Sequence, residues 1–351
     1  MVADVACAAG SLPPVTVEPL LEVADSLLGP VELIDDLTFS SKAHVARLRV
    51  QGGPTVVAKQ PLDPDAFARE VEAFEVLPAP VRPALVVAGR GVWVMEDLGA
   101  GPSLADLLLG SNPEAAEAAL LVWSETLGRA LRPTLRDGSA AAPDDLAGAV
   151  EQLGRLAAEL DVAVPGGVAD DVASIASTLA RPGPWLAFCP SDACPDNNRV
   201  LDDGSVRLFD FEGAGWRNAA LEAAYCRAPF CTCWCVARLP TGMRHRMESV
   251  FLAELVPANP SDFADVVALA AVSYTLVTFD WFRRFVMEDL PAGPAGRTPS
   301  TGRQYVYSRL ITIAAERERL PALADVAGRL AAAIVTRWPD AAAMPLYPAF
   351  R

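Results

Sequence analysis

The sequence predicts an α+β protein with two lobes, a small N-terminal lobe over residues 1–98 and a larger, mostly helical lobe over residues 99–351. Short apolar segments of strand length crowd the first hundred residues, whereas longer segments with helical periodicity make up most of the remainder. The chain has 351 residues and is 52% hydrophobic, so it is large enough to build two lobes around one cleft.

The first lobe is expected to begin with a helix over residues 15–30. Strands should follow and pair as an antiparallel sheet, at about 31–37, 44–50, 54–60, 84–88 and 91–96. One main helix over residues 65–77 interrupts these strands. Its apolar side chains recur every three or four residues, at Phe67, Val71, Phe74 and Leu77.

The second lobe begins with a short helix that Ser103 can cap with its hydroxyl oxygen. Residues 185–212 interrupt the helical pattern and read as strand, loop, strand, tight turn and strand. Breaks rich in Gly and Pro separate the other helical segments. These are expected at about 113–132, 143–160, 167–180, 218–228, 242–256, 261–288, 302–317 and 321–337.

The segment from residue 185 to 212 carries the most informative polar residues. Asn197 follows Asp192 by five residues, and Asp210 comes thirteen residues later, directly after an apolar strand. This arrangement resembles the catalytic core of aminoglycoside phosphotransferase-like small-molecule kinases, which have the protein-kinase-like fold. The resemblance implies that Asp192 accepts the proton of an acceptor hydroxyl, while Asn197 and Asp210 hold Mg²⁺ at the nucleotide phosphates. The alternative is an ordinary hairpin with polar caps, because Asp, Asn and Gly are common in turns.

The loop departs from the family pattern just before Asp192. The family usually has His-Gly there, whereas this chain has Pro190 and Ser191. Since the family His braces the loop, another group must do so here. Ser191 and Glu222 are the candidates.

Only two of the 29 basic residues are lysines, and Lys59 ends the apolar strand that begins at Thr55. The strand resembles the lysine-bearing strand of kinases, which implies that Lys59 contacts the α- and β-phosphates of the nucleotide. The helix that follows would supply the carboxylate that pairs with this lysine. Glu70 fits best and Glu72 is the weaker alternative, although solvent-facing acidic residues are common on helices.

The remaining nucleotide contacts are also implied by the resemblance. Ser40 and Ser41 lie in a Gly-free segment where the family places a phosphate-covering turn, and Ser41 is the preferred phosphate contact. The nucleotide is ATP or GTP, and its base, adenine in the case of ATP, would bind the crossover between the lobes. The expected contacts there are the carbonyl of Glu96, the amide of Leu98 and the side chain of Met95.

The expected activity is transfer of the γ-phosphate of ATP or GTP to a hydroxyl of a small molecule such as an antibiotic, a sugar or an amino alcohol. Asp196 and Glu212 flank the metal residues and could face this substrate. Polar and aromatic residues of the last third are further candidates, although each could equally belong to a helix core: Tyr274, Asp280, Trp281, Arg284 and Tyr305. A catalytically weak, pseudokinase-like binding protein is the alternative, favoured by Pro190 and the Gly-free loop.

Charge and cysteine usage limit the partners and the location. A net charge of −15 and a pI near 4.6 argue against binding to nucleic acid or anionic membranes. No apolar run is long enough to span a bilayer, and no basic region precedes the first apolar residues, so a cytoplasmic location is expected. Four cysteines cluster without zinc-ligand spacing and are predicted to be buried thiols outside any disulfide framework: Cys226, Cys231, Cys233 and Cys235.

Overall fold

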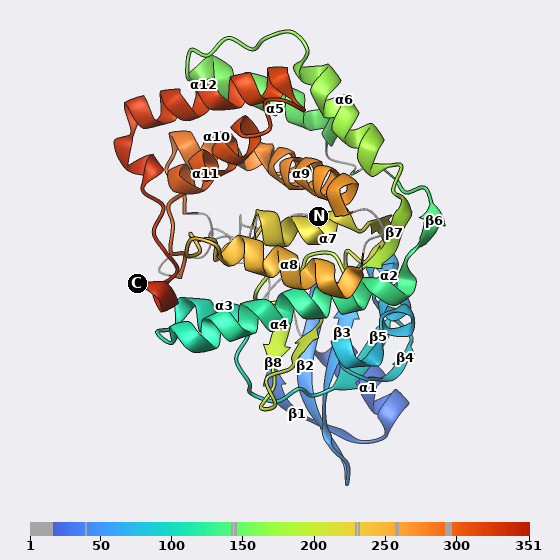
Figure 1. Cartoon of the computed structure of the whole chain (residues 1–351). Helices are drawn as coiled ribbons and strands as arrows, with labels where there is room; N and C mark the ends of the chain where they lie inside the picture. Colours follow the sequence, from blue (N-terminus) through green and yellow to red (C-terminus); the bar gives the residue numbers. More distant parts are fainter. Residues whose placement is uncertain are drawn as a thin grey trace.

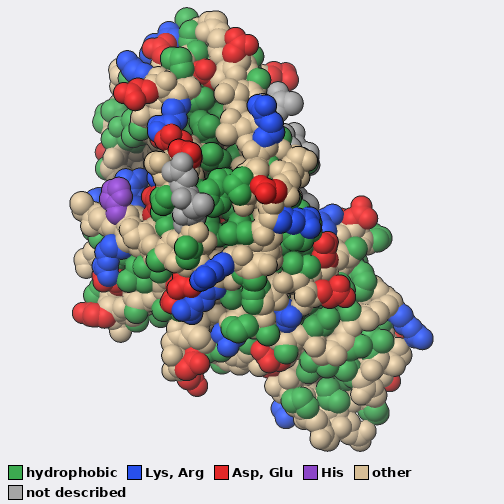
Figure 2. Space-filling model, turned by 45° about the vertical axis from the view of Figure 1, so that its right-hand side comes forward, with side chains coloured by type: hydrophobic (Ala, Val, Ile, Leu, Met, Phe, Trp, Pro, Cys, Tyr) green, Lys and Arg blue, Asp and Glu red, His purple; other side chains and the backbone are tan. Residues whose placement is uncertain are grey.

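The structure is a computed structural model, and it describes residues 17–38, 41–141, 143, 146–228, 230, 232–256, 260–291 and 297–351. An antiparallel sheet with its helices forms the N-terminal part, drawn in blue in Figure 1, and a larger helical part follows from green to red. The α+β class expected from the sequence is therefore confirmed. On the face seen in Figure 2, Lys and Arg side chains are interspersed with Asp and Glu.

The N-terminal sheet has the strand order β1-β2-β3-β5-β4, and every neighbouring pair is antiparallel. All five predicted strands are present within about two residues of their expected bounds. They are β1 (Val31–Asp36), β2 (Ala43–Val50), β3 (Thr55–Pro61), β4 (Leu85–Gly89) and β5 (Val92–Glu96).

Two helices cover opposite faces of this sheet. Helix α1 (Glu18–Leu28) packs Leu20 and Ala24 on the face that contains Val56 and Ala58 of β3. Helix α2 (Pro64–Val76) covers the other face, with Phe74 against Trp93 at 5.1 Å between ring centroids. Because side chains alternate along a strand, the side chains of Val57 and Lys59 point to the face that α2 covers. Lys59, near the end of β3, therefore faces the cleft between the lobes.

Helices α3 to α12 form most of the C-terminal part. Ser103 caps α3 as expected, since its hydroxyl accepts the backbone N–H of Asp106 and the Asp106 side chain accepts the N–H of Ser103. The helices are α3 (Leu104–Leu109), α4 (Pro113–Leu131), α5 (Leu146–Glu159), α6 (Val168–Leu179), α7 (Ala220–Arg227), α8 (Met243–Leu255), α9 (Pro260–Leu276), α10 (Phe279–Met287), α11 (Gly302–Ala314) and α12 (Pro321–Arg337). The described residues also contain four short 3₁₀ helices, at Ala79–Val81 in the N-terminal part and at Arg132–Thr134, Pro339–Ala342 and Pro348–Phe350 in the C-terminal part.

The single helix expected over residues 261–288 is wrong, because the chain bends by 57° between α9 and α10. At the bend the hydroxyl of Thr278 donates to the carbonyl oxygen of Thr275 at 2.8 Å, which is a local alternative to the helical hydrogen-bond pattern. Within the described part of the chain, no single helix combines the length and hydropathy of a membrane span, and α9 and α10 meet that test only as this bent pair.

Two small sheets hold the loop that carries the motif residues. β7 (Gly183–Cys189) pairs with β6 (Arg136–Gly138) and β10 (Gly215–Asn218), neither of which the sequence pattern indicated. β8 (Asn198–Val200) and β9 (Val206–Leu208) form the expected hairpin. The loop at residues 190–197 therefore runs from the end of β7 to the start of β8. It is called the catalytic loop below, after the role that the sequence predicts for Asp192.

The cysteine prediction is partly wrong. Cys194 and Cys233 form a disulfide, with their Cα atoms 5.8 Å apart, within the range that disulfides require. Their separation of 39 residues carries no local signal, and only tertiary packing brings them together. Cys189, Cys226 and Cys235 are free and buried, as expected of thiols that act as small apolar side chains. Cys231 lies outside the described residues.

Candidate active site

Lys59 is held between two carboxylates at the end of β3. Its Nζ lies 2.9 Å from Oε1 of Glu70 on α2 and 2.6 Å from Oδ1 of Asp210, which follows β9. Glu70 is completely buried and Lys59 nearly so. Burial alone would lower the pKa of Lys59, but the charges of Asp210 and Glu70 raise it above its ordinary value, so the ammonium stays protonated.

The structure also decides between the two acidic candidates on α2. Glu70 lies on the buried side of the helix, whereas Glu72 is exposed. The pairing expected for Lys59 therefore forms with Glu70.

In the catalytic loop, Asn197 and Asp192 are directly bonded. The Nδ2 atom of Asn197 donates to the backbone oxygen of Asp192 at 2.9 Å and to its Oδ2 at 3.0 Å. Burial and, to a smaller extent, the nearby charges of Asp210, Asp196 and Glu212 together raise the pKa of Asp192 to about 7. Asp192 and Asn197 thus lie in one polar group with Asp210, which in turn pairs with Lys59 and so connects them to Glu70.

The loop is braced by the two residues that the sequence suggested. Oε1 of Glu222 accepts the backbone N–H of Ser191 at 2.9 Å, and Arg217 donates to the Ser191 hydroxyl at 3.3 Å. Glu222 is 1% exposed, and burial raises its pKa to about 7. These bonds hold the loop just before Asp192, and they involve both residues that the sequence suggested for this role, Ser191 and Glu222.

A cavity of about 320 Å³ lies between the two lobes. Lys59, Asp210, Met95 and Leu98 line it, as the nucleotide assignments expected. The other lining residues come from the sheet, the crossover and the C-terminal lobe: Leu37, Lys42, Ala43, Val45, Arg47, Val57, Trp93, Asp97, Gly99, Asp196, Arg199, Phe209 and Glu212.

Three nucleotide assignments, Ser41, Glu70 and Glu96, fall outside this lining, and so do Asp192 and Asn197. Ser41 is exposed in the turn before β2, and its neighbour Lys42 lines the cavity instead, 3.5 Å from Glu212. Glu96 ends β5, with an exposed side chain and a backbone N–H that donates to Ala84. Ser40 lies outside the described residues.

The substrate candidates divide into two groups. Asp196 and Glu212 line the cavity, and Asp196 accepts the indole N–H of Trp234 at 2.7 Å. None of the five candidates from the last third lines it. Asp280 is exposed on α10, and Trp281 packs against the ring of Phe285. The structure therefore favours the helix-core interpretation for Trp281 and keeps Asp280 away from the cavity.

Sequence reasoning missed an ion pair at the cavity wall. Nε of Arg47 on β2 lies 3.0 Å from a carboxylate oxygen of Asp97 in the crossover. The side chain of Asp97 is only 8% exposed. Strand alternation places Arg47 on the same face as Val45, which pairs with Lys59 in the sheet, and this could have indicated its position. No local signal could have indicated Asp97 as its partner.

No protein-family model matches the sequence, and no curated protein matches it. Solved structures do match. A choline kinase from Cryptosporidium parvum has a TM-score of 0.50 and 10% identity, over 96% of this chain and 100% of that one. A protein described as a fructosamine-3-kinase from Thermobifida fusca has a TM-score of 0.50 and 16% identity, over 90% of this chain and 100% of that one.

These likenesses extend over almost the whole chain, and they include both the N-terminal sheet and the helical part. At such low identity they show a common fold and leave the chemistry of the site to its own residues. The protein therefore has the two-lobe, protein-kinase-like fold that these two solved small-molecule kinases share.

Proposed function

We propose that the protein transfers the γ-phosphate of ATP or GTP to a hydroxyl group of a small molecule. The observation that carries this proposal is the convergence of Lys59, Glu70 and Asp210 in one ion-paired group, of which Lys59 and Asp210 line the cavity between the lobes. The two structural neighbours, described as a choline kinase and a fructosamine-3-kinase, are consistent with a small hydroxyl acceptor. An antibiotic, a sugar or an amino alcohol would meet that requirement.

Lys59 acts on the nucleotide in this mechanism. Its protonated Nζ offers a compact positive charge to the α- and β-phosphates, and Glu70 fixes its direction from the buried side. Met95 and Leu98 line the part of the cavity formed by β5 and the crossover, where the purine would bind. The N-terminal lobe up to residue 98 would then carry most of the nucleotide contacts.

Asn197 and Asp210 would hold Mg²⁺ with the nucleotide. Among the described residues, no group of three or more His, Cys, Asp or Glu can hold a metal alone, and Mg²⁺ is usually held by one or two protein oxygens together with phosphates. Asn197 uses its Nδ2 atom in its bonds to Asp192, so its amide oxygen is the atom suited to a hard cation. Bound Mg²⁺ would neutralise phosphate charge.

Asp192 acts on the acceptor. Asn197 fixes one of its carboxylate oxygens, and the carboxylate can orient the acceptor hydroxyl toward the γ-phosphate and take up its proton as the bond forms. In the loose transition state of phosphoryl transfer, positioning matters more than a strong base. Asp196 and Glu212, which also line the cavity, are proposed to face the acceptor.

The test is a screen of hydroxyl acceptors with ATP and with GTP, read as nucleotide consumption, in the wild type and in Asp192→Asn. The variant should bind nucleotide with unchanged affinity and lose phosphoryl transfer by about 10²-fold or more. Asp137→Asn, at an exposed position of β6, is the matched control and should behave as the wild type.

Two results would contradict the proposal. Full turnover in Asp192→Asn would remove the role assigned to this carboxylate. A wild type that binds nucleotide but transfers phosphate to no acceptor in a broad panel would favour the pseudokinase-like binding protein instead.

A further inference from the structure

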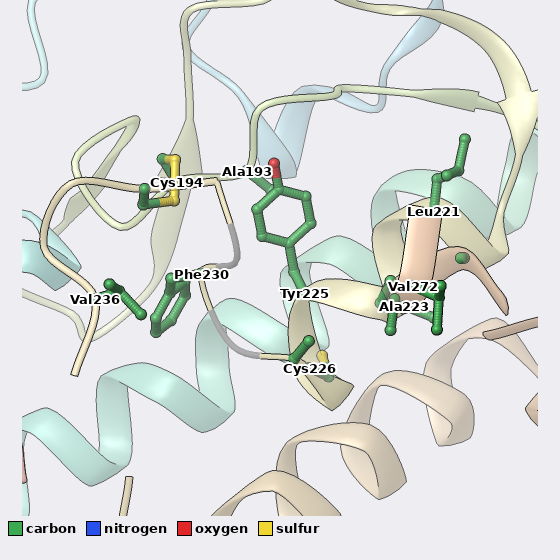
Figure 3. Packing of buried hydrophobic residues seen from close by; sticks show 14 of the residues in the cluster. Ala193, Cys194, Leu221, Ala223, Tyr225, Cys226, Phe230, Val236 and Val272 are labelled. Atoms are coloured by element: carbon green, nitrogen blue, oxygen red, sulfur yellow. A yellow bond between two sulfur atoms is a disulfide. The ribbon is translucent and has the colours of Figure 1, made fainter. Parts of the chain in front are cut away.

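The catalytic loop is joined twice to one segment of the C-terminal lobe. This segment, called the clamp segment, comprises the described residues Phe230 and 232–236. Cys233 forms the disulfide with Cys194, and Nε1 of Trp234 donates to Oδ2 of Asp196 at 2.7 Å. Figure 3 shows the disulfide of Cys194 beside Ala193, with Phe230 and Val236 nearby. Cys194 and Asp196 both lie between Asp192 and Asn197. The disulfide and the hydrogen bond therefore hold the part of the loop that carries the motif.

The clamp segment is itself anchored in the core of the C-terminal lobe. The hydroxyl groups of Tyr225 and Thr232 are 2.9 Å apart, and the ring of Phe230 lies 5.3 Å from that of Trp123 on α4. The hydroxyl of Ser300 donates to the backbone oxygen of Val236 at 2.8 Å. A displacement of Cys194 relative to the core is therefore resisted by the whole segment.

The backbone of the catalytic loop requires such support. Ser191 and Asp192 have φ values of 56° and 44°, in the left-handed region that residues other than glycine adopt only where their surroundings hold them. Cys194 lies inside the same turn, because its N–H donates to the carbonyl of Asp192 at 2.6 Å and its carbonyl accepts the N–H of Asn197 at 3.0 Å. Movement of Cys194 would move both motif side chains.

We propose that the Cys194–Cys233 disulfide is a positioning cross-link for the catalytic loop, and that its reduction by a dithiol lowers phosphoryl transfer reversibly. This inference rests on the proposed function. The dithiol supplies two electrons and two protons, the S–S bond becomes two thiols, and the dithiol closes to its own disulfide. Both cysteines are at most 4% exposed, so the reductant must act during local opening of the loop.

The effect should appear mainly in kcat and leave nucleotide binding without Mg²⁺ nearly unchanged, because Asn197, the proposed Mg²⁺ residue, moves with the loop. Lys59, Met95 and Leu98 lie outside the catalytic loop and are not attached to the clamp segment. Two thiols cannot keep the separation of bonded sulfur atoms, so the loop must shift, and a displacement of about 1 Å at a reacting group can lower the rate by about 10²-fold. In a reducing compartment such a bond would make activity depend on the redox state.

The first experiment compares the double variant Cys194→Ala/Cys233→Ala with Cys235→Ala, a buried free thiol of the same segment. The double variant should lose about 10-fold or more in kcat, with little change in the Kd for nucleotide measured in chelator, and Cys235→Ala should keep the wild-type kcat. Wild type treated with dithiothreitol, with two new thiols counted by mass spectrometry, should reproduce this loss. Reoxidation should restore it, and the double variant should not respond to the reductant.

A second measurement needs neither nucleotide nor acceptor. Reduction should speed hydrogen exchange of the backbone amides of residues 191–194, 196 and 197, which mass spectrometry can follow. If the wild type proves inactive on every acceptor, the proposed function fails, and faster exchange in this loop alone still supports the cross-link. Unchanged exchange after complete reduction, unchanged kcat in an active protein, or an equal loss of kcat in Cys235→Ala would each overturn the inference.

Discussion

Lys59 occupies a position in which its charge is needed by two neighbours. It pairs with Glu70 across the N-terminal lobe and with Asp210 across the cleft, and it lies almost fully buried between them. A buried carboxylate that loses its partner is destabilised, so the three groups depend on one another. Substitutions here separate catalytic from structural effects only when nucleotide binding and stability are measured together.

Lys59→Ala should lower kcat/KM for nucleotide by about 10²-fold or more, because one charge contact to the phosphates is lost in the transition state. Lys59→Arg should restore little, since a planar guanidinium cannot replace a compact ammonium in this enclosed position. Steady-state kinetics with varied nucleotide measures both. Normal kinetics in Lys59→Ala would show that the lysine has no role in catalysis.

Glu70→Gln and Glu72→Gln form a matched pair on α2. The first removes the charge beside Lys59 and should lower kcat/KM by about 10-fold or more, whereas the second changes an exposed side chain and should have little effect. Equal effects of the two substitutions would contradict the orientation of Lys59 by Glu70.

Glu222 should make the stability of the wild type depend on pH. Its pKa is about 7 in the folded chain, because of burial, against 4.5 when it is exposed. The unfolded chain therefore releases this proton as the pH rises through 4.5, while the folded chain retains it until about 7. The contribution of the protonated group to stability is present below pH 4.5 and is lost as the pH rises through 7.

Glu222→Gln removes this titration while it keeps an oxygen for the N–H of Ser191. Relative to the wild type, the variant should gain roughly 1–3 kcal/mol in the free energy of unfolding between pH 4.5 and 8. Urea unfolding at several pH values measures the difference. A constant difference between variant and wild type across this range would show that Glu222 does not titrate as described.

At the scale of elements, helix packing depends on a single glycine in α4. A Cβ added at Gly128 would lie 2.7 Å from Cβ of Glu254 and 2.7 Å from the backbone oxygen of Phe251, both on α8. The two helices approach so closely because this position has no side chain. α4 also packs near the β9 hairpin and β7, so its position affects the strands that flank the catalytic loop.

Gly128→Ala should destabilise the protein by about 1–3 kcal/mol, because the helices must separate to admit the methyl group. Gly154→Ala in α5 is the matched control, since its added Cβ would meet no atom within 4 Å. That substitution should be neutral or stabilise by up to about 1 kcal/mol through helix propensity. The two melting temperatures should therefore move in opposite directions; a common direction would contradict the packing argument.

At the scale of the whole molecule, ion pairs and hydrogen bonds connect the two lobes across the cleft. Lys59 forms an ion pair with Asp210, and Lys42 lies 3.5 Å from the carboxylate of Glu212. Arg69 on α2 donates a hydrogen bond to the backbone oxygen of Glu212 at 2.8 Å. The segment after β9 therefore contacts both the sheet and the helix of the N-terminal lobe. A nucleotide bound in the cavity would contact both lobes as well.

Nucleotide should therefore raise the melting temperature, and it should do so more strongly with Mg²⁺ than with excess chelator. At a concentration of 100 times Kd, a ligand that binds only the folded state stabilises it by about 2.7 kcal/mol. Asp210→Ala should abolish the difference between metal and chelator, whereas Asp202→Ala, in the exposed hairpin turn, should retain it. Equal stabilisation in chelator and in Mg²⁺ would contradict the metal assignment.

Much of this arrangement is readable from the sequence because it depends on local periodicity. The short apolar runs of β2, β3 and β5 predicted strands, and the run that begins at Thr55 placed Lys59 near a strand end. The residues near Phe74 predicted α2, and Ser103 predicted the start of α3. The spacing from Asp192 to Asn197 and Asp210 indicated one polar group, because two adjacent strands deliver its members to the same end of a hairpin.

The remaining features were decided by contacts between segments that are distant in sequence. Burial selected Glu70 over Glu72, and the packing of the clamp segment brought Cys194 to Cys233. The partner of Arg47 and the bend before α10 likewise follow from tertiary packing. Local sequence determines which side of an element a residue faces. The surface that meets this side depends on how all elements pack together. The sequence therefore indicated candidate site residues, and the tertiary structure determined which residues they contact.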